Sequence, residues 1–420
     1  MFDYLKSIKK ENRPFIILLA AALAVHLFLP LKWSDDALLM LWSSNADLSH
    51  FLIGSSRVLP GILIYYFARI NILWRLANPV VLTMLAVTIS KLIPCKDERL
   101  KNTVICIAVI YPAMFLVDAG FIATTLNYLW PVTFGLVALL PLQKVLKGKR
   151  LRWYECLACI PLVIYANSLQ QMCAVLTAIF FAACLYLLFK KKLHPYIILQ
   201  LLLCITCFIY AYKLSAIGEH SRLARDIVRY FPDFASLSIL NKSELGFSST
   251  FYCMTMEIRS AAVAFWAFSL FLATAVFRKT KRMPSRIVSA FPFVFSVLFG
   301  VANLIDYKYV PFLKYLTGNM VHYRMHLATY SFQPVPDILF LCVCASIVFS
   351  LCVLLENIQR IISALAVLSL GLASRLVMGF SPSVWASGYR TFFILFIAFI
   401  FCSIMVLDKN IGLFKKPKHD

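Results

Sequence analysis

Residues 10–36, KENRPFIILLAAALAVHLFLPLKWSDD, decide the fold class of this 420-residue chain. A basic segment leads into an apolar run, and an acidic pair follows it. The run is long enough to cross a membrane as a helix, because a span needs about 20 residues. Short loops rich in Lys and Arg stay in the cytoplasm, so we expect the acidic pair on the opposite side of the bilayer. No small-residue cleavage site follows the run, and we interpret it as an uncleaved first span.

The composition of the whole chain agrees with a membrane protein. Hydrophobic residues make up 61% and charged residues 14%, whereas soluble domains carry about 25% charged residues. The net charge of +22 lies in short loops between apolar runs. This distribution indicates control of topology and contact with anionic lipid, and it argues against a nucleic-acid partner. No polar segment is long enough for a nucleotide-binding domain.

Apolar periodicity predicts about twelve spans, and the charge distribution places both termini on the cytoplasmic side of an inner membrane. The expected spans are 14–31, 72–93, 102–118, 129–143, 153–167, 172–189, 196–216, 259–277, 287–304, 337–355, 361–379 and 391–407. The loops assigned to the cytoplasm hold compact basic clusters, such as Lys190, Lys191 and Lys192. No internal repeat or linker interrupts the pattern. We therefore expect residues 1–420 to form one all-α, polytopic membrane domain.

The segments assigned to the outer side are the places where chemistry is expected. They are 32–71, 118–130, 217–258, 305–336 and 380–390. In the first of them, Asp35 and Asp36 follow span one directly. A partly desolvated carboxylate can take a proton from a sugar hydroxyl as a general base. The alternative is that the pair caps an interfacial helix through 38–42, one Asp capping and the other reacting.

Several outer cations and aromatic residues are candidates for binding. Guanidinium groups offer a bidentate fork to phosphate, which makes Arg57, Arg375 and Arg390 candidates for a donor phosphate. Arg57 has a second interpretation, as a contact to lipid headgroups. Other candidates for lipid or acceptor binding are Arg222, Arg225 and Arg229 on one helical stripe, and His322, Arg324, Tyr128 and Trp130. An interfacial anchor or an aromatic belt would produce the same composition.

The thirteen cysteines lie mainly in the apolar segments. Buried Cys behaves as a small hydrophobe, and we expect no disulfide framework, metal site or redox role from these residues.

Five short motifs resemble those of the C-type (GT-C) glycosyltransferase superfamily, and in particular its phage-borne, serotype-converting O-antigen glucosyltransferases. The matching pieces are Ser34-Asp35-Asp36, Ser56-Arg57, Asn127-Tyr128-Leu129-Trp130-Pro131, Asn167-Ser168-Leu169-Gln170-Gln171 and Ser374-Arg375…Ser381-Pro382…Arg390. The resemblance extends over most of the chain, although each motif is short. It implies a bundle of about twelve spans with interfacial helices in the first outer loop.

The resemblance also implies an activity. A polyprenyl-phosphate sugar, with glucose as the sugar, would be the donor, and lipid-linked O-antigen the acceptor. Asp36 or Asp35 would act as base, with Asp36 favoured and Asp35 nearer the cap, and transfer would proceed with inversion and without metal or cofactor. An O-antigen polymerase, a flippase or other transporter, and an O-acetyltransferase stay open as alternatives.

Overall fold

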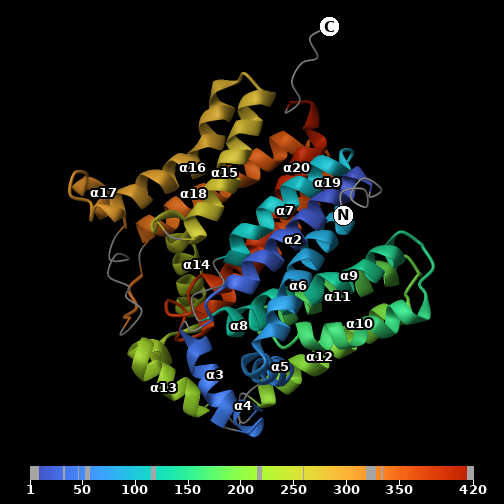
Figure 1. Ribbon diagram of the computed structural model, residues 1–420. Helices are drawn as coiled ribbons and strands as arrows, with labels where there is room; N and C mark the ends of the chain where they lie inside the picture. Colours follow the sequence, from blue (N-terminus) through green and yellow to red (C-terminus); the bar gives the residue numbers. More distant parts are fainter. Residues whose placement is uncertain are drawn as a thin grey trace. The chain divides into compact units, whose positions relative to one another are not determined.

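The computed structural model describes residues 9–31, 34–45, 47–52, 57–114, 120–214, 220–258, 260–317, 328–332 and 334–413. These residues form helices joined by short turns, and no strand occurs among them. The chain separates into two compact units, Met1–Arg222 and Leu223–Asp420. Each is described here by itself, with the helix labels of Figure 1.

Unit 1 contains the long helices α2 (Arg13–Phe28), α6 (Asn71–Leu92), α7 (Glu98–Met114), α9 (Trp130–Leu146), α10 (Trp153–Ala166), α11 (Gln170–Phe189) and α12 (Pro195–Leu214). Between α2 and α6 the chain forms α3 (Asp35–Asn45), α4 (Ser49–Leu52) and α5 (Val58–Arg69). Before α9 it forms the short helix α8 (Phe121–Thr124) and a π-helical turn, η2 (Thr125–Leu129).

Unit 2 contains the long helices α14 (Ile239–Thr255), α15 (Ser260–Lys279), α16 (Met283–Leu304), α18 (Pro334–Leu355), α19 (Ile358–Leu376) and α20 (Phe393–Lys409). Shorter helices are α17 (Pro311–Thr317), η4 (Pro232–Ser236), η6 (Val377–Phe380) and η7 (Tyr389–Phe392). Helix α13 (His220–Tyr230) contains the boundary between the two units.

The structure confirms an all-helical, multi-pass membrane protein. Nine helices of the described part are long and apolar enough to cross a membrane. Every one of the twelve expected spans coincides with a helix, and the three outside the nine coincide with α7, α10 and α12. The count of twelve spans stays a prediction, as does the description of residues 1–420 as one domain.

Two predicted outer segments contain buried helical residues. From Phe121 the segment 118–130 is helical and continuous with α9, in one apolar stretch that ends at Leu146. The segment 217–258 contains α14, whose second half is buried. The buried side chains of η2 and of the second half of α14 pack against other helices. The helix expected over 38–42 is confirmed as α3.

Polar side chains tie α2, α6 and the π-helical turn together within unit 1. The guanidinium group of Arg75, on α6, donates to the carbonyl oxygens of His26, Leu27 (3.1 Å) and Leu29 (2.8 Å), so it caps the C-terminus of α2. The indole N–H of Trp74 donates to the Thr125 hydroxyl at 2.9 Å. The last carbonyl groups of a helix have no partner within the helix. By binding them, Arg75 holds the end of α2, the helix that precedes the acidic pair, against α6.

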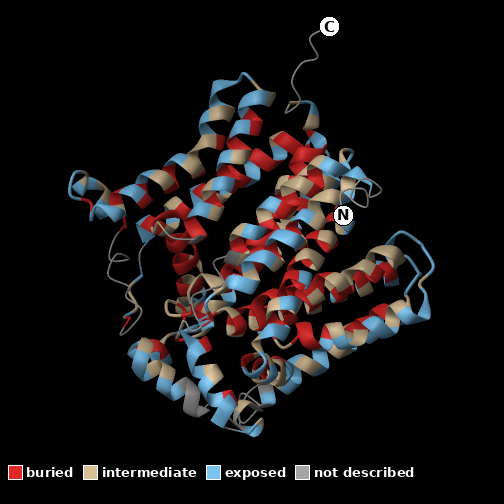
Figure 2. Cartoon of the chain, in the orientation of Figure 1, coloured by how far each residue is buried: buried red, intermediate tan, exposed pale blue. Residues whose placement is uncertain are grey.

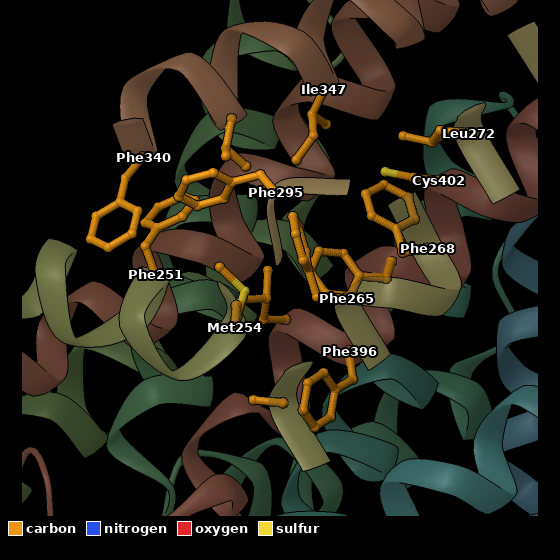
Figure 3. Close-up of a cluster of buried hydrophobic side chains, with 14 of the residues drawn as sticks. Phe251, Met254, Phe265, Phe268, Leu272, Phe295, Phe340, Ile347, Phe396 and Cys402 are labelled. Carbon is orange, nitrogen blue, oxygen red and sulfur yellow. The ribbon is translucent and has the colours of Figure 1, made fainter. Parts of the chain in front are cut away.

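Unit 2 has an aromatic core, part of which is drawn in Figure 3. The rings of Phe268 and Phe399 stack with centroids 4.5 Å apart. Helix α14 crosses η6 at two glycines: a Cβ on Gly246 would lie 2.1 Å from the Leu376 carbonyl oxygen, and one on Gly379 would lie 2.1 Å from that of Lys242. The crossing therefore needs glycine on both sides, and it holds the end of α19 against α14. The long helices carry buried and exposed faces, as Figure 2 shows.

Candidate active site

Asp36 is the centre of the site in unit 1. Its side chain is fully buried, and its carboxylate accepts three backbone N–H groups at the start of α8. Phe121 donates to Oδ2 at 2.5 Å, Ile122 to both oxygens at 3.1 and 3.2 Å, and Ala123 to Oδ1 at 3.3 Å. The first N–H groups of a helix have no partner within the helix. Asp36 thus caps a helix that begins 85 residues further along the chain.

Gly120 makes this cap possible. It precedes α8 with φ 96° and ψ 149°, a combination that glycine alone adopts readily. A Cβ here would lie 2.6 Å from Oδ1 of Asp36 and 2.8 Å from its backbone nitrogen. The carboxylate can approach the helix end only because this position carries no side chain.

The two aspartates lie in different environments. Burial raises the pKa of Asp36 to about 6, although the N–H groups of Ile122, Ala123 and Phe121 oppose that shift. Asp35 is the preceding residue in the first turn of α3 and is exposed. Asp36 has both oxygens engaged by backbone, whereas Asp35 is open to a second molecule. The sequence favours Asp36 as the base and Asp35 as the residue nearer the cap, whereas in the structure Asp36 is the capping residue.

Two further predicted residues lie next to these elements. The Arg57 guanidinium lies over the Tyr128 ring, 5.8 Å from its centroid, and Tyr128 belongs to the π-helical turn η2. Helices α3, α5 and α8 contact one another, and α5 also contacts η2. Unit 1 therefore gathers the acidic pair, Arg57 and Tyr128 around the start of the fourth expected span.

Trp130 lies in the core of unit 1. Its side chain is buried, its indole N–H donates to Asn78 Oδ1 at 3.0 Å, and its ring packs edge-on against that of Phe67. These contacts give it a structural role in the described arrangement.

Arg375 is the most distinctive polar residue of unit 2. Its side chain is 1% exposed, near the end of α19. The guanidinium group lies 4.6 Å from the centroid of the Phe392 ring, and Nη2 donates to the Val384 carbonyl oxygen at 3.3 Å. Nε and Nη1 have no partner among the described residues. A buried cation with two nitrogens that lack hydrogen-bond partners is costly without a counter-charge, so this geometry suits an anion.

An apolar cavity in unit 2 is lined by residues of α19 and α20, among others. It measures about 210 Å³ and is lined by Phe251, Met254, Phe265, Cys344, Ile347, Val348, Leu365, Leu368, Ser369, Leu372, Leu395 and Phe399. Four of these lining residues are labelled in Figure 3. Leu368 and Leu372 precede Arg375 at helical spacing, as Leu395 and Phe399 follow Phe392, so cation and cavity share one stripe of α19 and of α20. Leu372, which lines the cavity, and Arg375 are three residues apart on α19, which corresponds to a rise of about 4.5 Å along the helix.

The turn between η6 and η7 adds hydroxyl groups beside the buried cation. The Ser383 hydroxyl lies 2.9 Å from that of Ser381 and 3.0 Å from that of Ser387, and Val384, the partner of Arg375, belongs to the same turn. Arg390 follows on η7 and is half-buried. Unit 2 therefore brings Arg375 and the predicted tail motif together.

The other candidates are distributed as follows. Arg225 and Arg229 lie on α13, as the spacing predicted, and the Arg229 guanidinium lies 5.2 Å from the centroid of the Tyr230 ring. Arg222 belongs to the same helix, but its side chain is outside the described part. His322 and Arg324 lie outside the described residues altogether.

Sequence reasoning missed Gly120 and one half-buried acid of unit 2, Glu244 on α14. Burial raises the pKa of Glu244, whose carboxyl group lies beside that of Asp337 on α18. Nothing in the local sequence signals this pair, because its members are far apart in the chain and meet through packing.

The described residues include no group of three or more His, Cys, Asp or Glu side chains that could hold a metal ion. All thirteen cysteines are free thiols. No protein-family model, no curated protein and no solved structure matches the chain.

Proposed function

We propose that this protein is a membrane glycosyltransferase that transfers a sugar from a polyprenyl-phosphate donor to lipid-linked O-antigen at the periplasmic face of a bacterial inner membrane. The observation that carries the proposal is Arg375, a fully buried guanidinium with two nitrogens that have no hydrogen-bond partner among the described residues. It stands one helical turn from an apolar cavity. A lipid phosphate has both features, an anionic head and a hydrocarbon chain, and a soluble sugar phosphate has only the first.

The acidic pair offers a general base for such a transfer. The acceptor hydroxyl gives its proton to a carboxylate while its oxygen attacks the anomeric carbon, and the bond from that carbon to the phosphate oxygen breaks. We assign the proton transfer to Asp35, which is exposed. Asp36 acts as a positioning residue, because its carboxylate is occupied by the backbone of α8.

The leaving group is a polyprenyl phosphate, which departs as an anion and needs cationic stabilisation. Removing a preorganised donor of this kind typically costs about 10²- to 10³-fold in rate. Arg375 is the first candidate for that role, with Arg57 and Arg390 as further candidates. The transferred sugar, glucose according to the resemblance, stays part of the proposal.

A transporter is the less favoured alternative. Transport sites place ionisable groups near mid-membrane, whereas Arg375 is next to the last residue of α19 and Asp337 is in the first turn of α18. Analysis of O-antigen from cells with and without the gene separates the other candidates. One added hexose per repeat supports transfer, a changed chain length indicates a polymerase, and an added acetyl group indicates an acyltransferase.

The base assignment is tested in membrane vesicles that contain the full chain and a polyprenyl-phosphate sugar. Asp35→Asn should abolish transfer without changing insertion or thermal stability, because its carboxylate is exposed. Asp47→Asn is the matched control, another exposed aspartate of the same outer segment. Full transfer by Asp35→Asn would contradict the assignment.

The phosphate assignment is tested separately. Arg375→Lys keeps the charge but loses the planar fork, and it should raise the KM for the donor and lower the rate. Arg375→Ala should be at least as impaired, and Arg150→Ala, an exposed arginine of unit 1, should behave as wild type. An unchanged donor KM in folded Arg375→Lys would remove this residue from the site.

A further inference from the structure

Unit 1 also contains a cavity, which lies where α6 and α9 end in lysine-bearing turns. It measures about 590 Å³ and is lined by Glu11, Asn12, Phe15, Val87, Ser90, Lys91, Ile93, Pro94, Glu98, Lys101, Asn102 and Lys147. The start of α2, the end of α6 and the start of α7 meet here. No residue proposed above for sugar transfer lines this cavity.

Buried polar groups give the cavity a fixed frame. Lys101 is 2% exposed, and its ammonium group donates to the carbonyl oxygens of Ser90 (2.9 Å) and Ile93 (3.1 Å) and pairs with Glu98 at 2.6 Å. Asn102 accepts the Ser90 hydroxyl at 2.6 Å and donates to the Glu11 carbonyl oxygen at 2.8 Å. These bonds join three helix ends, so the space between them is part of the folded structure.

The charges that remain around the cavity favour an anion. Glu98 is neutralised by Lys101. Lys91 and Lys147 are exposed, and neither has an ion pair or side-chain hydrogen bond within the described part of the chain. The lining therefore carries two ammonium groups without an ion pair among the described residues, and one further carboxylate, that of Glu11.

The size and the mixed lining indicate a small amphipathic group. Pockets for small ligands measure about 300–1,000 Å³, and Phe15, Val87 and Ile93 offer apolar contact beside the two lysines. Basic pockets between spans on the cytoplasmic side are suited to phosphate-bearing lipid headgroups. We propose that this cavity binds a phosphate ester with a small polar substituent, such as the headgroup of an anionic phospholipid. This site is independent of the proposed transferase activity.

The test uses the purified full chain in nanodiscs of phosphatidylcholine, with and without phosphatidylglycerol, and glycerol 3-phosphate as the soluble probe. Native mass spectrometry measures retained phosphatidylglycerol, and calorimetry measures binding of glycerol 3-phosphate. The variant Lys91→Ala/Lys147→Ala should weaken binding at least about tenfold, because it removes both charge-assisted contacts. The matched control Lys192→Ala/Lys281→Ala removes two exposed lysines elsewhere and should bind as wild type.

A second variant tests the cavity without changing its charge. Val87→Phe places a larger side chain in the space and should weaken binding in a protein that still folds. Wild-type binding by either cavity variant, or an equal loss in the control pair, would overturn the proposal. Competition by glycerol 3-phosphate would identify the phosphate headgroup as the determinant, and retention of phosphatidylglycerol without such competition would identify the intact lipid.

Discussion

Substitution of Gly120 by Ala should destabilise unit 1 through two separable effects. The backbone of Gly120 occupies a region that other residues enter at a cost of about 1–3 kcal/mol. The new Cβ would also lie 2.6 Å from Oδ1 of Asp36 and 2.8 Å from the Asp36 backbone nitrogen, and overpacking of this kind costs about 1–3 kcal/mol. We therefore expect a total of about 2–6 kcal/mol, with partial loss of the hydrogen bonds to α8.

Gly148 supplies the matched control for this experiment. It also has a positive φ, 67°, but a Cβ there would meet no atom within 4 Å. Gly148→Ala should cost only the backbone term, about 1–2 kcal/mol. The difference between the two variants reports the contact with Asp36 together with any extra backbone cost at Gly120.

Thermal unfolding of the detergent-solubilised protein measures both variants. With about 2–4 °C per kcal/mol for a domain of this size, Gly120→Ala should lower Tm by roughly 4 to 24 °C. Amide exchange at 121–123 should become faster in Gly120→Ala and stay unchanged in Gly148→Ala. Equal Tm values for the two variants would refute the close approach of Asp36 to α8.

Other predictions concern charge. Because burial raises the pKa of Asp36 to about 6, the protonated form is favoured by folding. The stability that this protonated group contributes is complete below the ordinary pKa near 4 and is lost as the pH rises through 6. Over this interval the Tm of the wild type should therefore fall relative to that of Asp36→Asn. A Tm difference that does not vary with pH would contradict the raised pKa of Asp36. Lys101→Ala leaves the Ser90 and Ile93 carbonyl groups unpaired and should destabilise by about 2–4 kcal/mol, whereas exposed Lys192→Ala should change stability by less than about 0.5 kcal/mol; similar denaturation curves for both would argue against the buried lysine clamp. Chelator should leave sugar transfer intact, and a loss that Mg²⁺ or Mn²⁺ restores would show that the reaction needs metal.

The sequence predicted the spans well because hydropathy is a property of contiguous residues. Residues 72–93 and 196–216 are apolar whatever they pack against, and α6 and α12 begin and end within a few residues of those limits. The predicted span 129–143 begins too late, because the residues from Phe121 onward are helical and continuous with α9. There Thr125 bonds to Trp74 and Asn127 donates to the Ala123 carbonyl oxygen, so these polar side chains form hydrogen bonds inside a helical stretch.

The candidate site could be predicted in part for the same reason. The order of charged and apolar residues along the chain is enough to single out Asp35, Asp36 and Arg375. It cannot tell the two aspartates apart, because they are adjacent on one helix turn. Their roles differ through Phe121 and its neighbours, whose amides reach Asp36 alone.

The chain by itself thus determined a helical membrane protein and the segments that carry its charge, since the cost of placing charge in hydrocarbon acts on each residue separately. Tertiary structure decided which carboxylate is buried, which arginine lacks a counter-charge among the described residues, and where the cavities lie. Those features depend on which distant backbone groups and side chains meet. Contacts over such separations come from packing, and no local pattern in the sequence encodes them.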